Sequence, residues 1–478
     1  MPPPRRAARR RSATAAEPPR AVRGSRRLSV RHGEPFKREG RCGDGGDDDD
    51  GLPLSDEALL LVFSALSFTT ADLVRCAATC RRWRRLVSAD AAFICPLATP
   101  RSDPCIGSLA LGFFHSHMTD GGVAQPRFVP LSAAASRIQP SFAALVDAGA
   151  SRVVASRNGR LVLDLRRRAN TRVTHAVRLG VCNRVTGGGG GVDVLPQLRG
   201  KDSPSGPYAC TVITAADERG GDRRMMTRYS SYRVLLLYNR RGFTALRCYS
   251  SDAGSWGPEA EVTGARIGRT QLAVGPHAAV VHRGVVFWPR LAVALRLDSL
   301  LQPAPAVAVS AAKNNADTPP RYTVAGFSPA ARQRHSSTTV SAAHRLLGVM
   351  PGGGLLRVEA DSETIRAYWG GRKDGDADGD GDIVDGGCLL GEALKWRWTK
   401  MQALMMVHTV RLRWLCEKSG LVIFTARNNS DPYTHVYTLD VETEEFRRVA
   451  TAAGGESSLG EMCGYEMDRV TLLALLGR

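Results

Sequence analysis

Apolar residues recur at helical spacing in one stretch near the start of the chain, residues 54–93. Ser55 or Asp56 can accept hydrogen bonds from the free N–H groups of a first turn, so we expect a helix to begin there. Four apolar residues then follow at intervals of three and four positions, which is the spacing of one helical face. The first helix is therefore expected to bury the face made by Leu59, Val62, Phe63 and Leu66.

A second helical stretch follows a break at residues 67–70. Asp72 places negative charge near the new N-terminus, where the helix dipole favours it. Apolar residues again share one stripe along a single second helix, namely Leu73, Cys76, Ala77, Cys80, Trp83 or Arg84, and Val87. Four arginines are expected to stay in solvent or along the edge of that stripe: Arg75, Arg81, Arg82 and Arg85.

Beyond residue 100 the period changes to short apolar or alternating runs separated by Gly, Pro, Asn and Asp, a pattern typical of strands. The clearest runs are 152–165, 233–238, 279–288, 355–359, 421–426 and 435–439. A turn glycine precedes paired aliphatic residues at four places: Gly159, Gly284, Gly354 and Gly420. At about 40 to 50 residues per blade, the remaining chain would form a kelch-like β-propeller of six to eight irregular blades. A pair of β-sandwiches is the competing architecture.

Length and composition agree with several folding units. A chain of 478 residues exceeds the size at which single cores stop growing, and 43% of its residues are hydrophobic. We find no run of eighteen apolar residues and no apolar segment of a secretory signal, so we expect a soluble intracellular protein without membrane contact. The eleven cysteines form no C-x-x-C pair, which favours reduced, mostly buried thiols.

The formal net charge of +19 is concentrated at the N-terminus. Residues 1–41 contain thirteen Lys or Arg against three Glu, and this difference makes up more than half of the net positive charge of the chain. Because this segment has few bulky apolar residues and several prolines, we expect residues 1–50 to form a disordered basic tail that ends in an acidic linker. The tail could carry a nuclear-import signal, an organelle transit signal or a weak nucleic-acid contact, although a plain solvated tail is equally compatible.

The helical stretch resembles the F-box, a motif of about forty residues that docks a substrate receptor onto the Skp-type adaptor of a cullin-RING ubiquitin ligase. Its ordered positions match Leu54, Leu66, Leu73, Cys80, Trp83 and Leu86. Ser55 stands where the family usually has Pro, unless Leu52 and Pro53 form the opening pair. The resemblance implies an F-box domain at residues 51–96 whose adaptor-binding residues are Leu54, Leu59, Val62, Phe63, Leu66, Leu73, Val74, Cys80, Trp83 and Leu86.

The later chain is similar to the F-box-associated β-propeller domain of plant, grass-type F-box proteins. The similarity rests on ASRNGRLVLDL, LGVCNRVTG and VLPQL, with Arg184 at a usual Pro position. It continues through YRVLLLYNRRGFTALRCYSSDAGSW, AVVHRGVVFWP, LLGVMPGGGLLRV, EKSGLVIFTA and GYEMDRVTLLALL. It implies that residues 105–478 form a propeller. It identifies the architecture of this domain but not the protein client that such a receptor would bind.

One acidic run could bind a cation. Its spacing matches an EF-hand-like calcium loop, with oxygen ligands at Asp374, Asp376, Asp378, Asp380, Asp382 and Asp385. The flanks lack paired amphipathic helices, so a low-complexity acidic insertion is the better interpretation. His115 and His117 favour a surface pair over a metal site, because no third ligand follows at suitable spacing. The five glycines at 187–191 lack the Lys and Ser or Thr of a phosphate-binding loop.

These observations predict a mainly β protein with a small N-terminal helical module. The expected function is a non-catalytic substrate-recognition subunit of a Skp/cullin/F-box ubiquitin ligase, located in the nucleus, the cytoplasm or both. The adaptor, and through it a cullin, would be partners, the protein client is not specified, and no cofactor is expected. Three alternatives stay open: a non-degradative F-box scaffold, a nuclear protein that contacts nucleic acid through the tail, and an enzyme with a polar pocket at the propeller axis.

Overall fold

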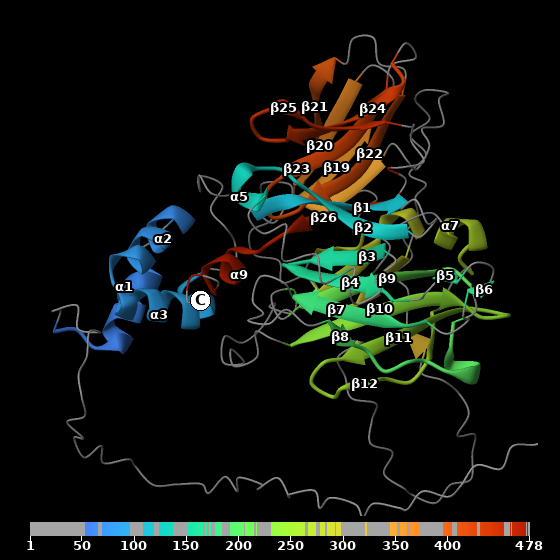
Figure 1. Cartoon of the computed structure of the whole chain (residues 1–478), viewed down its shortest axis with the longest axis horizontal. Coiled ribbons are helices and arrows are strands. Elements are labelled where there is room, and N and C mark those ends of the chain that lie inside the picture. Colours follow the sequence, from blue (N-terminus) through green and yellow to red (C-terminus); the bar gives the residue numbers. More distant parts are fainter. Residues whose placement is uncertain are drawn as a thin grey trace, which may run out of the picture. The chain divides into compact units, whose positions relative to one another are not determined.

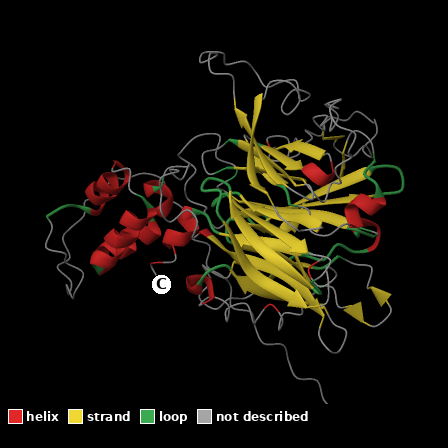
Figure 2. Cartoon of the chain, turned by 90° about the horizontal axis from the view of Figure 1, so that it is seen from above, coloured by secondary structure: helices red, strands yellow, loops and turns green. Residues whose placement is uncertain are grey.

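The structure is a computed structural model, and strands make up most of the chain that it describes (Figure 2). The described residues are 53–65, 69–95, 109–118, 124–136, 145, 152–165, 168–169, 172–173, 177–183, 192–204, 206–214, 217, 231–262, 266–273, 278–282, 284–291, 293–297, 321–322, 345–350, 354–360, 364–371, 395–403, 409–427, 431–453, 459, 461–474 and 476.

Most strands belong to six mainly antiparallel sheets, numbered I to VI in the order in which their first strands occur along the chain (Figure 1). Sheet I has the order β2-β1-β26, where β1 is Ala110–Met118, β2 is Ala124–Pro130 and β26 is Met462–Glu466. Sheet II has the order β3-β4-β7-β8, with β3 at Arg152–Arg157, β4 at Arg160–Asp164, β7 at Leu179–Asn183 and β8 at Asp193–Val194. A hairpin of β5 (Arg168–Ala169) and β6 (Arg172–Val173) stands apart from them.

Sheet III is built on β9 (Tyr208–Thr214), β10 (Tyr232–Asn239), β11 (Thr244–Ser250) and β13 (Ala260–Val262), with short β12 (Ser255–Trp256) and β17 (Arg321–Tyr322) added. β17 pairs with β13 in parallel. Sheet IV contains β14 (Val280–His282), β15 (Val285–Trp288) and β16 (Val293–Arg296). Sheet V contains β18 (Arg345–Val349), β19 (Leu355–Ala360), β20 (Thr364–Gly371) and β21 (Lys395–Ala403). Sheet VI contains β22 (Thr409–Cys416), β23 (Leu421–Arg427), β24 (Tyr433–Asp440) and β25 (Phe446–Ala453).

The sheets pack as a ring, because each hydrophobic cluster of the β domain is shared by neighbouring sheets. One cluster joins sheets II and III, a second joins III and IV, and a smaller one joins IV to V. Another joins V and VI. The largest cluster joins VI to I and II, so the last sheet packs against the first two. Separate sheets around a ring are the arrangement of a β-propeller. The predicted mainly β fold with a propeller is therefore confirmed, and the six sheets agree with six to eight blades.

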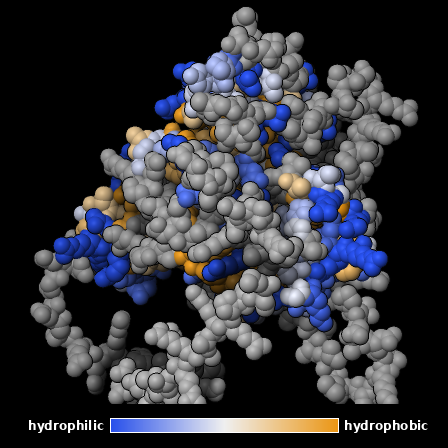
Figure 3. Space-filling model, turned by 45° about the vertical axis from the view of Figure 1, so that its right-hand side comes forward, coloured by the Kyte–Doolittle hydropathy of each residue, from blue (hydrophilic) through white to orange (hydrophobic). Residues whose placement is uncertain are grey.

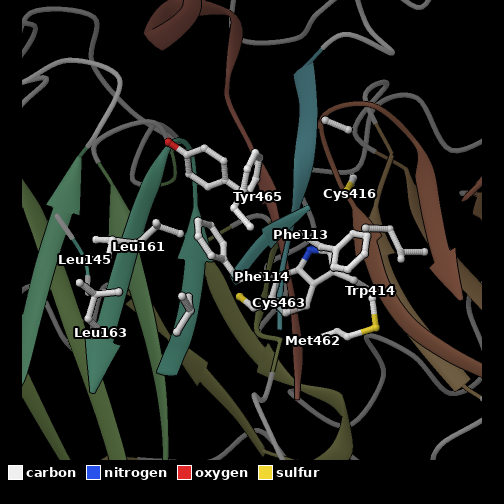
Figure 4. Close-up of a cluster of buried hydrophobic side chains, with 14 of the residues drawn as sticks. Phe113, Phe114, Leu145, Leu161, Leu163, Trp414, Cys416, Met462, Cys463 and Tyr465 are labelled. Carbon is white, nitrogen blue, oxygen red and sulfur yellow. The ribbon is translucent and has the colours of Figure 1, made fainter. Parts of the chain in front are cut away.

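Sheet I closes the ring by pairing the two ends of the β domain. β26 pairs with β1, which also pairs with β2, so the final strand completes a sheet begun by the first two. Phe114 packs against Tyr465 on one face of sheet I, with 5.8 Å between ring centroids, and Phe113 lies beside Trp414 on the other face (Figure 4). Trp414 lies against the backbone of Gly464, where an added Cβ would come within 2.2 Å of the indole, so only glycine fits.

Three of the four predicted turn glycines explain how the inner hairpins form. Gly159, Gly284 and Gly420 have positive φ angles of 76°, 72° and 73°, which glycine adopts without steric cost. Each stands between the first and second strands of its sheet. At the first of these turns Asn158 also has a positive φ of 48°, and Asn-Gly with two positive φ angles is the favoured two-residue hairpin turn.

The helices that matter for the site are α1 (Asp56–Ala65), α2 (Thr70–Thr79), α3 (Arg81–Ala89), α4 (Ala91–Ile94) and α9 (Arg469–Ala474). Short α5 (Ala133–Ser136) and α7 (Arg269–Ala273) lie within the β domain. No helix in the described part of the chain has the length and apolar character needed to cross a membrane. The sequence interpretation assigned residues 469–474 to the β domain, whereas the structure packs α9 against the N-terminal helices.

Candidate functional site

Local hydrogen bonds set the start of the first two N-terminal helices. The Ser55 hydroxyl accepts a hydrogen bond from the Ala58 N–H at 3.2 Å, as predicted for the start of α1. Thr69 and Asp72 form a reciprocal capping box at α2, with the Asp72 N–H donating to Thr69 Oγ1 at 3.2 Å. The hydrogen bond from the Thr69 hydroxyl, joined by Arg75, lowers the pKa of the Asp72 carboxyl below its ordinary value. The carboxylate is thus kept charged where the helix dipole favours it.

The predicted single second helix is wrong, because the chain breaks at Cys80. This residue is extended, with φ of −152° and ψ of 169°, and it separates α2 from α3. Its Sγ accepts a hydrogen bond from the Trp83 N–H at 3.4 Å, so the thiol caps α3 in the way that a serine hydroxyl often does. Cys80 therefore sets a corner between two helices.

Much of the predicted adaptor-binding set lies inside the helical module. Leu59, Phe63, Leu73 and Leu86 are at most 5% exposed and share one core with Val87, Ala91, Ile94 and Leu473. Trp83 packs edge-on against Phe63, with 5.1 Å between ring centroids. Val74, Cys80 and Trp83 are partly buried. These seven residues shape the module, and their side chains offer little or only partial surface to a partner.

A smaller set of apolar side chains is available for contact. Leu54 and Val62 are each 42% exposed, and both belong to the predicted set. Leu61 is 60% exposed and Phe93 is 44% exposed, yet the sequence interpretation included neither. Exposed large apolar residues concentrated on one small module indicate a contact surface. Leu66 lies outside the described residues.

Arginines link α1 to α3 and add charge to α2 and α3. Arg82 Nε donates to Asp56 Oδ1 at 2.8 Å, and Arg82 Nη2 donates to the carbonyl of Leu54. The Arg82 side chain is 14% exposed, which rules out a position in solvent but agrees with the alternative expectation that it lies along the edge of the stripe. It fixes the segment that carries Leu54 to α3. Arg75, Arg81, Arg84 and Arg85 are exposed, which makes the outer face of α2 and α3 basic.

A second candidate lies where β3, β9, β22 and β26 end. Arg157 Nε donates to Asp217 Oδ1 at 2.7 Å, and Arg157 Nη1 donates to Glu417 Oε2 at 2.8 Å. The Glu466 carboxylate accepts hydrogen bonds from the N–H groups of Glu417 and Lys418, each at 2.9 Å. Burial, together with the neighbouring Glu417 carboxylate, raises the pKa of Glu466 to about 7. We call Arg157, Asp217, Glu417 and Glu466 the axial cluster.

An enzyme hidden in the propeller would need titratable groups with perturbed pKa values, and the axial cluster contains such groups. However, Arg157, Glu417 and Glu466 are only 7%, 8% and 8% exposed, and they pair with one another or with backbone N–H groups. Structural ion-pair networks perturb pKa values in the same way as catalytic sites do. The geometry therefore favours a network that holds four strand ends together.

The other sequence candidates have different outcomes. Among the described residues, no group of three or more His, Cys, Asp or Glu is placed to hold a metal ion. The acidic run at 374–385 and the five glycines at 187–191 lie outside the described residues. His115 lies on β1, and the side chain of His117 is not described. The eight described cysteines are free thiols, as the spacing predicted.

Several solved structures are similar to this chain. One is a protein from Lactobacillus plantarum, with 10% identity, a TM-score of 0.29, and coverage of 75% of this chain and 100% of that one. Another is the β-propeller domain of the trilobed protease from Pyrococcus furiosus, with 10% identity, a TM-score of 0.28, and coverage of 61% and 78%. A prolyl endopeptidase shares 12% identity at a TM-score of 0.25, and the match spans 63% of this chain but only 36% of that enzyme.

The helical module is similar to a known family. A search of curated proteins finds none that matches this chain. A family model described as F-box-like matches residues 53–93, a range that includes Pro53 and contains α1, α2 and α3. The module built from these helices is therefore an F-box-like domain.

Proposed function

We propose that this chain is the client-recognition subunit of a Skp/cullin/F-box ubiquitin ligase, and that its β domain is of the grass-type F-box-associated kind. The observation that carries the proposal is the F-box-like match over residues 53–93, on a module that leaves large apolar side chains in solvent. F-box domains generally bind Skp-type adaptors. The proposed docking residues are Leu54, Leu61, Val62 and Phe93.

The β domain would hold the client. F-box proteins are generally non-catalytic, so this chain would contribute proximity between client and ubiquitin-conjugating enzyme rather than an acid, a base or a nucleophile. The client is a protein that must be found by experiment. Such a complex would act in the nucleus, the cytoplasm or both.

A double substitution, Leu61→Asp with Val62→Asp, is expected to weaken adaptor binding by about 2 kcal/mol or more, which is about thirtyfold. Both side chains are exposed in the free chain, so the change places charge in the docking surface without opening the helical core. Trp83 is a poorer choice, because its ring packs on Phe63 and its loss would also disturb the fold. Titration of a purified Skp-type adaptor against the intact chain and the variant measures the effect.

The matched control is Val194→Asp. Val194 lies on β8 and is 50% exposed, close to the 42% of Val62, but it belongs to the β domain. Adaptor affinity should be unchanged in this control. An intact, folded chain that fails to bind the adaptor would contradict the proposed function, and equal affinities for all three proteins would remove these residues from the docking surface.

A further inference from the structure

The core of the F-box-like module contains residues from the far end of the chain. Leu473 of α9 is completely buried, in the same cluster as Leu86, Val87 and Ile94. Val470 and Leu476 also pack against this cluster. Helix α9 contacts α2, α3 and α4. Residues 53–93 therefore do not complete their own core, and the C-terminal helix supplies one of its walls.

The same C-terminal segment is anchored in the ring immediately before α9. The Glu466 carbonyl accepts a hydrogen bond from the Gly159 N–H at 2.8 Å, and the Tyr465 hydroxyl donates to the Gly159 carbonyl at 3.0 Å. The Met467 N–H donates to the Leu109 carbonyl at 2.9 Å. The Glu466 carboxylate accepts two N–H groups from the turn after β22. Three separate segments thus hold the end of β26.

The linker between the anchored end of β26 and helix α9 is short. Only Met467 and Asp468 lie between β26 and α9, and Met467 is 2% exposed. Asp468 Oδ1 accepts a hydrogen bond from the Thr471 N–H at 2.6 Å, which caps the helix directly after the strand. Arg469, at the first position of α9, is 4% exposed. A displacement of β26 must therefore be transmitted to Leu473 within a few residues.

We propose that residues 467–476 are a strap that keeps the docking helices ordered only while β26 closes the ring. The functional consequence rests on the proposed function, because an adaptor would then bind only those chains in which β26 has closed the ring of sheets. The strap is encoded after the strands of all six sheets. A chain that lacks this end, or whose ring is open, carries the complete F-box-like sequence but lacks a wall of its core. Docking would thereby select receptors that are able to hold a client.

Hydrogen exchange on the full chain tests the strap without any adaptor. Leu473→Asp should lower the protection of α2 and α3 amides at least tenfold and weaken adaptor binding by a similar factor, because a charge enters the shared core. The matched control is Leu472→Asp at the neighbouring, half-buried residue that the helical core does not include. Its α2 and α3 amides should keep their protection. Unchanged protection in Leu473→Asp would overturn the strap.

A second variant tests the coupling from the ring side. Tyr465→Phe removes the hydroxyl that donates to Gly159 but keeps the aromatic ring in its cluster, so the sheets should stay packed. We expect a several-fold loss of protection in α9, α2 and α3 together. Loss in β26 with full protection of α2 and α3 would overturn the coupling. If the intact chain binds no adaptor, the proposed function fails, whereas the exchange results still decide whether the strap orders these helices.

Discussion

Replacing Arg157 with Met is expected to lower the free energy of unfolding by about 3–5 kcal/mol. The guanidinium pairs with Asp217 and Glu417 at 2.7 and 2.8 Å, and the three side chains are only 8%, 3% and 9% exposed. Burial alone would raise the pKa of the Asp217 carboxyl, but Arg157 and Lys418 outweigh burial and hold this pKa below its ordinary value. Without Arg157 two buried carboxylates lose their cation, which costs more than the pair contributes when intact.

Methionine is the appropriate replacement because it fills much of the volume of the arginine stem while removing the charge. Urea denaturation at pH 7.5 gives the free energy of unfolding for the parent and the variant. Adding Asp217→Asn to Arg157→Met should recover part of the loss, since one of the two unpaired charges is then removed.

An exposed ion pair provides the control for this prediction. Arg75 pairs with Asp72 at 2.6 Å, but its side chain is 77% exposed, so Arg75→Met should cost less than about 1 kcal/mol. Losses of equal size at Arg157 and Arg75 would show that the axial cluster is not a buried network and would contradict the prediction.

Features fixed by neighbouring residues were predictable from the sequence. The start of α1 at Ser55, the acidic residue Asp72 in the first turn of α2 and the turn at Gly159 each depend on contacts within a few positions. Strand positions followed from the short apolar or alternating runs between turn residues, and several of these strands, such as β4 and β9, are buried on both faces. The propeller was expected from the chain length at about 40 to 50 residues per blade and from the family resemblance, whereas a pair of β-sandwiches stayed open. The structure decides between them through distant contacts, such as the pairing of β1 with β26.

The break at Cys80 was missed because a thiol counts as apolar in a periodicity argument. Cys80 falls on the stripe that runs from Leu73 to Val87. However, its sulfur accepts a hydrogen bond from a backbone N–H and the helix is interrupted there, so the stripe is not one continuous helical face. A capping role of this kind leaves no mark in hydrophobic spacing. Serine or aspartate at the same position would have signalled the boundary.

The exposed apolar residues of the helical module were predicted only in part, because helical spacing identifies the buried face more readily than the exposed one. Leu59 and Phe63 lie on the stripe and form the core, while Leu61 lies off the stripe and is exposed. An apolar residue on the solvent side of an amphipathic helix was the available signal. The role of Leu473 had no local signal, since its partners lie at the other end of the chain.

The free energy of unfolding is expected to fall by about 3 kcal/mol as the pH rises from 4.5 to 8, and Glu466 is the cause. Burial, with the nearby Glu417 carboxylate, raises the pKa of Glu466 from 4.5 to about 7 in the folded chain. In the unfolded chain the carboxyl ionises near its ordinary value of 4.5. Between these two values the folded state holds a proton that the unfolded state has released.

The sign of the effect follows from this difference in bound protons. Stabilisation by protonated Glu466 is fully present below pH 4.5 and is lost as the pH rises through about 7. Asp217 acts in the opposite direction, because its lowered pKa gives stability that is lost as the pH falls below 3.8. Between pH 5 and 8 the slope from this pair should therefore come from Glu466.

Glu466→Gln should remove that slope. Glutamine cannot titrate, so the difference in unfolding free energy between variant and parent should change by about 3 kcal/mol between pH 4.5 and 8. The oxygen of its amide still accepts one of the two N–H groups, whereas the other N–H meets an NH₂ group, which shifts the whole profile without restoring a slope. Glu442→Gln, at an exposed carboxylate, is the control and should leave the profile of the parent unchanged. Denaturation midpoints at half-unit pH steps measure the three profiles. Parallel profiles for the parent and Glu466→Gln would mean that Glu466 ionises in the folded chain as it does in the unfolded one.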